Sequence, residues 1–288
     1  MNQVRFGPAG HCGQSYADGA KTTEQLIAYL GAKGLSAFEY QCGRGVRLAE
    51  AKAGNFRKLA QEQGLSLSVH APYYISLASA EEKKRENSVE YILQSARAVD
   101  WLGGARIVVH PGGLGGLSRE KATALAGETL RRAVDTLEAN GLGHVHICLE
   151  TMGKINQLGT LEEVLELCML DERMLPCVDF GHLNARTHGS LQTRADFAAV
   201  LDAIRDRLGE GRMRAMHIHF SKIEFSAGGE VRHLTFEDQQ FGPDYRLLME
   251  ELAQREMACT VICESAGTQT ADSLEMQRYY QSVREHCT

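Results

Sequence analysis

Short apolar segments alternate with helix-like segments along the whole of this 288-residue chain. Eight of the apolar segments have the length and composition of β-strands, and a loop and a helical pattern follow each of them. The strands are expected at about Val4–Gly7, Ala37–Tyr40, Leu67–Ala71, Ile107–Pro111, His146–Glu150, Leu175–Asp179, Met213–His219 and Cys259–Glu264. The helices are expected near 22–32, 46–62, 82–102, 118–139, 160–170, 192–208, 243–256 and 270–286. Such strict alternation predicts a parallel sheet with helical crossovers.

Eight strand–helix units in a chain of this length favour a closed (β/α)8 barrel, the TIM barrel, which typically takes about 250 residues. The competing fold is an open doubly wound sheet that binds a dinucleotide. That fold needs Gly-x-Gly-x-x-Gly after its first strand, whereas this chain has Phe6-Gly-Pro-Ala-Gly10. No low-complexity linker or break in composition divides the chain. We therefore expect one α/β domain, a single TIM barrel over residues 1–288.

The composition argues against several other classes of protein. No segment has the roughly 20 consecutive apolar residues of a membrane-spanning helix, and residues 1–7 lack the apolar core of an export signal. We therefore expect a cytoplasmic protein. The eight cysteines form no Cys-x-x-Cys pair and lie mostly in apolar segments, so we expect reduced core residues. The net charge of −6 argues against a general basic surface for nucleic acid, although bound cations can still contact phosphate.

Imidazole and carboxylate side chains stand at the carboxyl ends of six successive predicted strands. They are His70, His110, Glu150, Asp179, the pair His217 and His219, and Glu264. In a closed parallel barrel these strand ends open onto one face, where the active sites of this fold lie. A single histidine at a strand end is more often a structural hydrogen-bonding group, but that does not explain six strands in succession. The pattern predicts a shared site at the rim.

Two details of this pattern leave alternatives open. Asp179-Phe-Gly-His182, on its own, also has the form of a helix N-cap followed by a surface histidine. His217 and His219 have the same parity on their strand, so only one of them needs to reach the rim.

A group of buried carboxylates and histidines is costly without a cation, because buried charges lose their hydration and like charges repel. Oxygen and imidazole ligands without thiolate suit Zn²⁺, with Mn²⁺ and Fe²⁺ as alternatives. Glu150 has candidate ligands on both sides and could bridge two ions. Closely spaced ions stabilise the attacking and leaving oxygens of a phosphodiester and generate hydroxide near neutral pH.

Several short motifs together resemble the endonuclease IV family. They are His70-Ala-Pro-Tyr73 with Leu77-Ala-Ser79, His110-Pro-Gly-Gly113, Glu150-Thr151, Asp179-Phe-Gly-His182, Met216-His217 and Glu264-Ser265. The resemblance runs over nearly the whole chain, and the members of this family are trinuclear-zinc apurinic/apyrimidinic endonucleases on a TIM barrel. It implies a hydrolase that cleaves double-stranded DNA at abasic sites in base excision repair. We also expect a monomer.

The resemblance implies a role for each matching residue. The ligands implied for a first ion are His70, His110 and Glu150. Those implied for a second ion are Glu150 as a bridge, Asp179, His217 and Glu264. Those implied for a third ion are His182 and His233. The implied catalytic residues, which would orient the ions and the attacking water, are Glu150 and Glu264, and Tyr73 would lie close to the DNA.

The chain departs from the family in the motif for the third ion. Val231-Arg232-His233 stands where the family has Asp-Arg-His, and Glu230, one residue earlier, is the substitute ligand that we expect. After the strand-seven histidine the chain has His219-Phe220-Ser221-Lys222, where the family commonly has Asn-Asp ahead of a lysine. The loop after the second strand also differs, and Arg44 in this loop is expected to contact substrate phosphate.

Two other classes of function fit part of this pattern. A sugar isomerase or epimerase of the xylose isomerase-like superfamily would bind one divalent ion and transfer protons next to a carbonyl. Its ligands would be Glu150, Asp179, a strand-seven histidine and Glu264. A non-catalytic metal-binding barrel is the third class. The number of ions per chain separates the phosphodiesterase from the isomerase or epimerase. The histidines outside the ligand set that these two classes share favour two or three ions.

Overall fold

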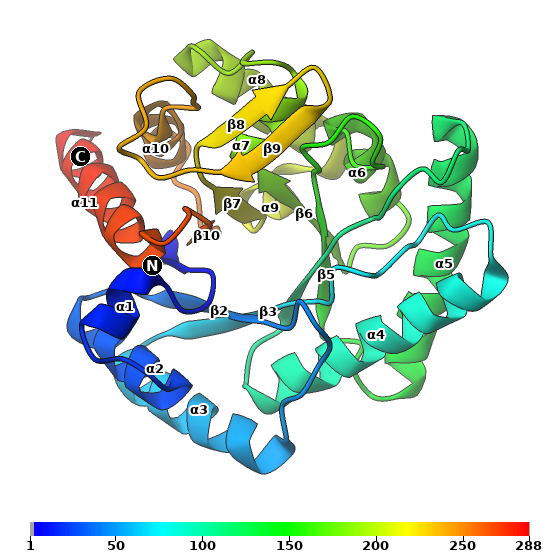
Figure 1. The fold of residues 1–288 in the computed structure, drawn as a ribbon, viewed down its shortest axis with the longest axis horizontal. Helices are drawn as coiled ribbons and strands as arrows, with labels where there is room; N and C mark the ends of the chain where they lie inside the picture. The colour runs from blue at the N-terminus through cyan, green and yellow to red at the C-terminus, as the bar shows by residue number, and fades with distance from the viewer. Residues whose placement is uncertain (1–2, 288) are drawn as a thin grey trace.

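The computed structural model describes residues 3–287, and its centre is a parallel barrel of eight strands (Figure 1). The barrel strands are β1 (Arg5–Pro8), β2 (Ala37–Gln41), β3 (Ser66–His70), β4 (Arg106–Val109), β5 (His146–Glu150), β6 (Met174–Asp179), β7 (His217–Phe220) and β10 (Thr260–Cys263). Their order is β1-β10-β7-β6-β5-β4-β3-β2. The sheet closes between β1 and β2, where the N–H of Gly10 donates to the carbonyl of Glu39 at 3.0 Å. The predicted TIM barrel is confirmed.

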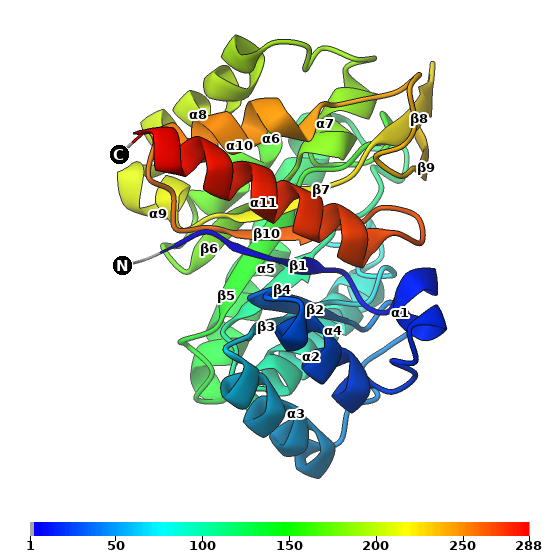
Figure 2. The ribbon, with the colours of Figure 1, turned by 90° about the vertical axis from the view of Figure 1, so that its left-hand side faces the viewer.

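Helices surround the barrel and connect its strands (Figures 1 and 2). They are α1 (Gly13–Ala17), α2 (Thr23–Ala32), α3 (Glu50–Gln63), α4 (Glu82–Trp101), α5 (Arg119–Ala139), α6 (Leu161–Cys168), α7 (Phe180–Arg186), α8 (Arg194–Leu208), α9 (Glu210–Arg214), α10 (Tyr245–Gln254) and α11 (Gln269–Cys287). The eight predicted helices are present, and the short helices α1, α7 and α9 were not predicted. Most of the core lies between the helices and the outward side of the sheet, where Leu149 and Val178 are fully buried.

Strand β7 begins later than the sequence predicts. Extended structure was expected from Met213, but Glu210–Arg214 form helix α9 and β7 starts at His217. Met213 is buried on this short helix, so its apolar character reflects burial and not a strand. His217 is therefore the first residue of the strand, and the β6–β7 register places His219 beside Asp179.

An antiparallel hairpin outside the barrel was not predicted. It consists of β8 (Ile223–Ser226) and β9 (Gly229–His233), and it lies over the carboxyl end of the barrel beside α7 (Figures 1 and 2). The N–H of Glu230 donates to the carbonyl of Gly153 at 3.0 Å, which ties the hairpin to the loop after β5. Gly229 has φ +86°, and a Cβ there would lie 2.2 Å from the Gly153 carbonyl oxygen. Only glycine permits this conformation and this approach.

Part of the barrel interior below the strand ends is apolar. Val108, Cys148, Leu175 and Cys177 form a buried cluster there. The cysteines whose side chains the structure describes are buried and free, in agreement with the prediction of reduced core residues. Within residues 3–287 no helix is long and apolar enough to cross a membrane.

Candidate metal centre

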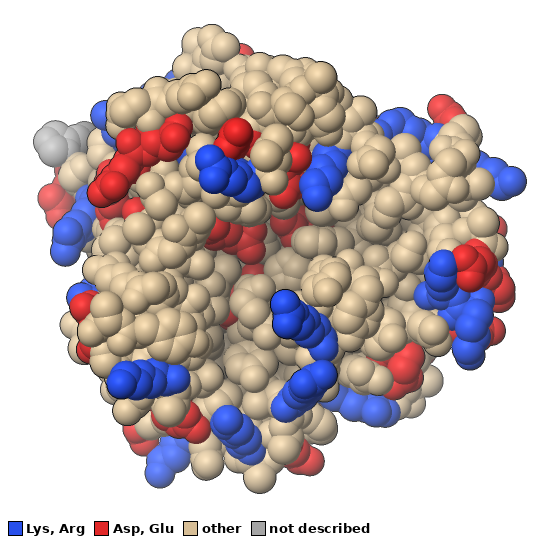
Figure 3. All heavy atoms as spheres, in the orientation of Figure 1, with Lys and Arg blue, Asp and Glu red and all other residues tan. Residues whose placement is uncertain are grey.

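Glu150, the last residue of β5, lies at the centre of the histidines and carboxylates of the barrel mouth. Its side chain is fully buried, and it lies close to histidines that belong to three groups of candidate ligands, which are described in turn below. Figure 3 shows this face with a hollow at its middle, where Asp and Glu side chains gather, and with Lys and Arg around the margin. The side chains at these strand ends therefore lie together at the mouth of the barrel.

The first group consists of His70, His110 and Glu150. The Nε2 atoms of His70 and His110 lie 3.3 and 3.0 Å from Glu150 Oε2. His70 Nδ1 is 2.8 Å from the carbonyl oxygen of Ala71, which accepts a hydrogen bond from it. In a neutral imidazole this bond leaves the lone pair on Nε2, the atom that faces Glu150.

The second group consists of Glu150, Asp179, His219 and Glu264, whose ligand atoms lie within 4.8 Å of one another. His219 Nδ1 is 3.3 Å from Glu150 Oε1 and 3.5 Å from Glu264 Oε2. The sequence placed His217 in this group, and the structure corrects that position. His217 is two residues deeper in the strand, level with Cys177 on β6, and its imidazole contacts Glu39.

The third group consists of His182, Glu230 and His233 and joins helix α7 to the hairpin. His182 Nε2 lies 3.5 Å from Glu230 Oε2, and His233 Nε2 lies 4.0 Å from Glu230 Oε1. Backbone and side-chain acceptors hold the opposite nitrogens, because His182 Nδ1 is 2.9 Å from the carbonyl oxygen of Thr151 and His233 Nδ1 is 2.9 Å from Ser221 Oγ. Glu230 thus lies near both of the histidines that the resemblance implies for a third ion, and its part as a ligand stays a prediction.

Both interpretations of Asp179-Phe-Gly-His182 hold in part. Asp179 is the N-cap of α7, and its Oδ1 accepts the backbone N–H of His182 at 2.7 Å. His182 is not a surface histidine, since it is 4% exposed and points into the site. The cap leaves Asp179 Oδ2 free to face the second group.

The ligand atoms of these groups suit divalent cations. Glu150 Oε2 and Asp179 Oδ2 are buried and face imidazole nitrogens, His110 Nε2 at 3.0 Å and His182 Nδ1 at 3.4 Å. Ligand atoms in a tetrahedral shell with bonds of about 2.1 Å are about 3.4 Å apart, close to the 3.0–3.5 Å between the imidazole and carboxylate atoms of the first two groups. A buried carboxylate is costly unless it is paired with a positive charge. A cation bound between these carboxylate oxygens and imidazole nitrogens would supply that charge.

Without ions, protons take the place of cations in this cluster. Burial alone would lower the pKa of His70, but Glu150 raises it to about 9. Burial would likewise lower the pKa of His182, and Asp179 raises it to about 10. Burial would raise the pKa of Glu150, yet His110 and His219 hold it well below its ordinary value. Each shift favours a positive charge beside a negative one, as a bound cation does.

The two predicted substrate-binding residues lie at the rim and not among the ligands. Tyr73 follows β3 and is 61% exposed, and Arg44 is exposed in the loop after β2. The N–H of Tyr73 donates to the carbonyl of Gly43 at 3.3 Å, so the two loops lie side by side. Their role in binding stays a prediction.

Glu39 is the member of this cluster that the sequence analysis missed. It lies on β2, is fully buried, and forms a group of possible ligands with His217 and His219. A signal was present, because Ala37-Phe-Glu-Tyr40 places an acid at an inward position of an otherwise apolar strand.

A closed parallel barrel with overlapping histidine and carboxylate groups at its carboxyl end defines a TIM barrel with a candidate metal centre. The chain belongs to the xylose isomerase-like TIM barrel family, whose model matches residues 25–280. It is 36% identical over 231 residues to the uncharacterized protein MJ0133 of Methanocaldococcus jannaschii, covering 80% of this chain and 82% of that protein. It is 31% identical to a probable endonuclease 4 of Acholeplasma laidlawii, over 61% of this chain and 60% of that protein.

Solved structures with the same fold include enzymes of two kinds. A D-tagatose 3-epimerase-like protein superposes with a TM-score of 0.74 at 20% identity and covers 99% of this chain and 100% of its own. Endonuclease IV from Thermus thermophilus superposes with a TM-score of 0.67 at 22% identity and covers 98% of this chain and 99% of its own. At such identities these likenesses show the fold alone. The predicted resemblance to endonuclease IV within the xylose isomerase-like barrels is confirmed.

Proposed function

We propose that this chain is a metal-dependent phosphodiesterase of the endonuclease IV type, which hydrolyses double-stranded DNA at abasic sites. The observation that carries the proposal is the third ligand group, His182, Glu230 and His233, placed directly beside the other two. A barrel that needs one ion has no use for this group, whereas a phosphodiesterase with several ions does. The match to a probable endonuclease 4 also supports it.

Three ion sites follow from the three groups. Glu150 belongs to the first and the second, so we propose it as the bridging ligand. Zn²⁺ suits these imidazole and carboxylate ligands, with Mn²⁺ or Fe²⁺ as alternatives. Divalent ions held here would polarise a phosphoryl oxygen and lower the pKa of a water molecule.

The carboxylates differ in their access to substrate. Glu150 is fully buried and serves to hold ions, whereas the Glu264 side chain is 15% exposed and reaches the mouth of the barrel. Burial would raise the pKa of Glu264, but His219 lowers it to about 2. An ionised Glu264 can therefore accept a hydrogen bond from the attacking water and orient it. At the rim, Tyr73 would contact the DNA and Arg44 a phosphate.

The test is cleavage of a duplex that contains one abasic site by zinc-, manganese- and iron-loaded protein. Cleavage at that site, lost in Glu264→Gln, is the expected result. An intact duplex under all three loadings rejects the proposal. The exposed Glu166→Gln is the matched control, because it makes the same chemical change outside the site.

A single-ion sugar epimerase is the second candidate. It is favoured by the second group, Glu150, Asp179, His219 and Glu264, which can hold one ion by itself. The fold of the D-tagatose 3-epimerase-like protein is also close. In this case ketohexoses would be epimerised, one ion would be bound per chain, and substitutions in the third group would leave the activity unchanged.

A further inference from the structure

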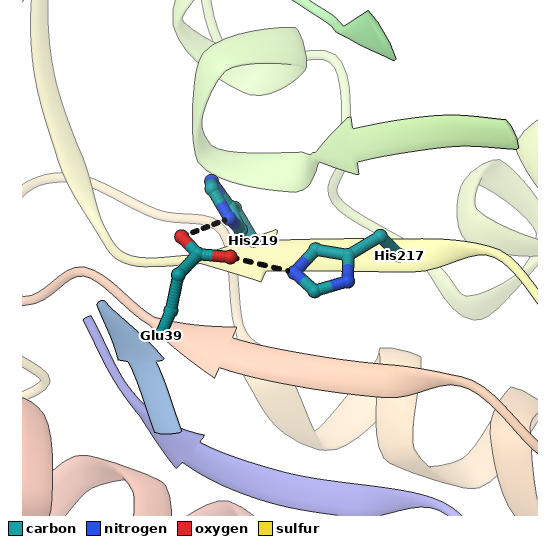
Figure 4. A group of neighbouring side chains, drawn as sticks. All are labelled: Glu39, His217 and His219. Carbon is teal, nitrogen blue, oxygen red and sulfur yellow. Dashed lines mark hydrogen bonds and ion pairs between the residues drawn. The ribbon is translucent and has the colours of Figure 1, made fainter. Parts of the chain in front are cut away.

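Glu39 is an ionisable side chain enclosed in the barrel, below the second group. It is fully buried, and its neighbours on the strand, Phe38 and Tyr40, point to the opposite side of the sheet. Figure 4 shows Glu39 between two histidines of β7, His217 toward the base of the barrel and His219 toward its mouth. A buried carboxylate is costly unless donors surround it, so its contacts reveal its role.

Both oxygens of Glu39 face donors. Oε2 accepts hydrogen bonds from Ser68 Oγ at 2.9 Å and from His217 Nε2 at 3.0 Å. Oε1 accepts one from Gln41 Nε2 at 3.3 Å and lies 3.1 Å from His219 Nε2. These contacts fix the position of the carboxylate and occupy the atoms that a directly bound ion would need.

His219 connects Glu39 to the second group. Its Nε2 faces Glu39, and its Nδ1 faces Glu150 at 3.3 Å and Glu264 at 3.5 Å. A neutral imidazole carries one N–H. In the ion-free structure the Nδ1 of His219 is within hydrogen-bond distance of Glu150, but once an ion takes up the carboxylates beside Nδ1, Glu39 is the acceptor that remains and keeps the hydrogen on Nε2. The lone pair is then on Nδ1, directed at the carboxylates of the second group.

We propose that Glu39 is a positioning residue, which fixes the Nε2–H tautomer and the ring orientation of His219 and so presents Nδ1 to an ion in the second group. The proposal rests on the metal centre proposed above. His217 has a supporting part, since it holds Oε2 of Glu39 while its own Nδ1 has no hydrogen-bond partner among the described residues. This accounts for two histidines of the same parity on one strand.

The first test compares Glu39→Gln with Ser68→Ala in the full-length protein. Ser68 donates to Oε2 of the same carboxylate, whereas His219 lies beside Oε1, so the loss of Ser68 is the matched control. Competition of Zn²⁺ with a chromogenic chelator measures the dissociation constants. In Glu39→Gln the zinc ion of the second group is expected to bind about 10- to 100-fold more weakly, and in Ser68→Ala less than about threefold.

The second test identifies which nitrogen of His219 binds zinc, and it uses the wild-type protein. Long-range ¹H–¹⁵N spectra of zinc-loaded, ¹⁵N-histidine-labelled wild-type protein are expected to show His219 with a proton on Nε2 and zinc on Nδ1. Binding through Nε2, or unchanged affinity in Glu39→Gln, overturns the role of Glu39 and leaves the metal centre in place. If Glu39→Gln loses one ion completely and binds the other ions as tightly as the wild type does, Glu39 is itself a ligand. That result also overturns its role as a positioning residue. Wild-type protein that binds no divalent ion overturns the centre itself.

Discussion

His182 on helix α7 and Glu230 on strand β9 approach to 3.5 Å between Nε2 and Oε2, although they belong to separate parts of the fold. His182 is positioned by the helix that follows β6, and Glu230 by a hairpin outside the barrel sheet. Their meeting creates a ligand group beyond the four residues that a single ion would take. It also distinguishes the proposed phosphodiesterase from the epimerase, because only the phosphodiesterase requires a third ion.

Protein purified without chelators is expected to contain two or three divalent ions per chain by elemental analysis. Because buried Glu150 is shared by the first two groups, removal of the ions leaves its carboxylate dependent on protons alone. We expect EDTA to lower the midpoint of thermal unfolding and Zn²⁺ to restore it. A single tightly bound ion in every preparation would instead support the epimerase.

His233→Asn is expected to remove one ion per chain and to reduce cleavage of abasic DNA at least about 10-fold. His233 supplies one of the nitrogens of the third group, and asparagine is a poorer ligand. His188→Asn is the control, because His188 is exposed and has φ +53°, a conformation that asparagine tolerates. Equal ion content in both variants excludes a third site that depends on His233.

Gly229→Ala is expected to displace the hairpin. The added Cβ would lie 2.2 Å from the Gly153 carbonyl oxygen at φ +86°, a strain of about 1–3 kcal/mol. We expect loss of the third ion, with the ions of the first and second groups retained. In the neighbouring Gly228→Ala the nearest atom to the new Cβ is Ser226 Oγ at 3.8 Å, so that variant should keep every ion.

Zinc binding is expected to tighten as the pH rises and to release protons at neutral pH. Glu150 raises the pKa of His70 to about 9, and Asp179 raises that of His182 to about 10, both against the effect of burial. An ion must displace these protons at pH 7, so affinity increases about 10-fold per pH unit for each proton displaced. Calorimetry in buffers of different ionisation enthalpy measures the release, and a zinc affinity independent of pH from about 6 to 8.5 contradicts it.

The same two histidines determine how the metal-free protein responds to pH. Their folded-state pKa values are raised above the ordinary value of 6.5. Their contribution to stability is therefore fully present below about pH 6.5 and is lost as the pH rises through about 9 to 10. Denaturant unfolding of the metal-free protein across this window is expected to show the decline, and zinc-loaded protein is the control.

Much of the barrel could be predicted because each strand is a short apolar segment, and six successive strands end in a ligand-type residue. The start of β7 could not, since Met213 is buried in a helix as fully as it would be in a strand. The family resemblance gave His217 as the expected ligand. His217 and His219 have the same parity, and only the register with β6 places His219 beside Asp179.

Two other parts of the site depend on contacts distant in sequence. Glu39 gains its role from histidines that lie 178 or more residues further along the chain, and a lone acid in an apolar strand does not identify its partner. Glu230 could be proposed only by analogy with the missing aspartate. Its position depends on the turn after β8, for which Ala227-Gly-Gly229 between two alternating segments was the available signal.

The hairpin shares no strand pairing with the barrel, yet it supplies two of the three residues of the third group. The third ion that we propose thus depends on a hairpin whose strand pairing is separate from that of the eight barrel strands. Transfer of such a hairpin to a barrel of the same family that binds one ion offers a way to raise the number of bound ions. The recipient must have a histidine one turn into the helix after its sixth strand.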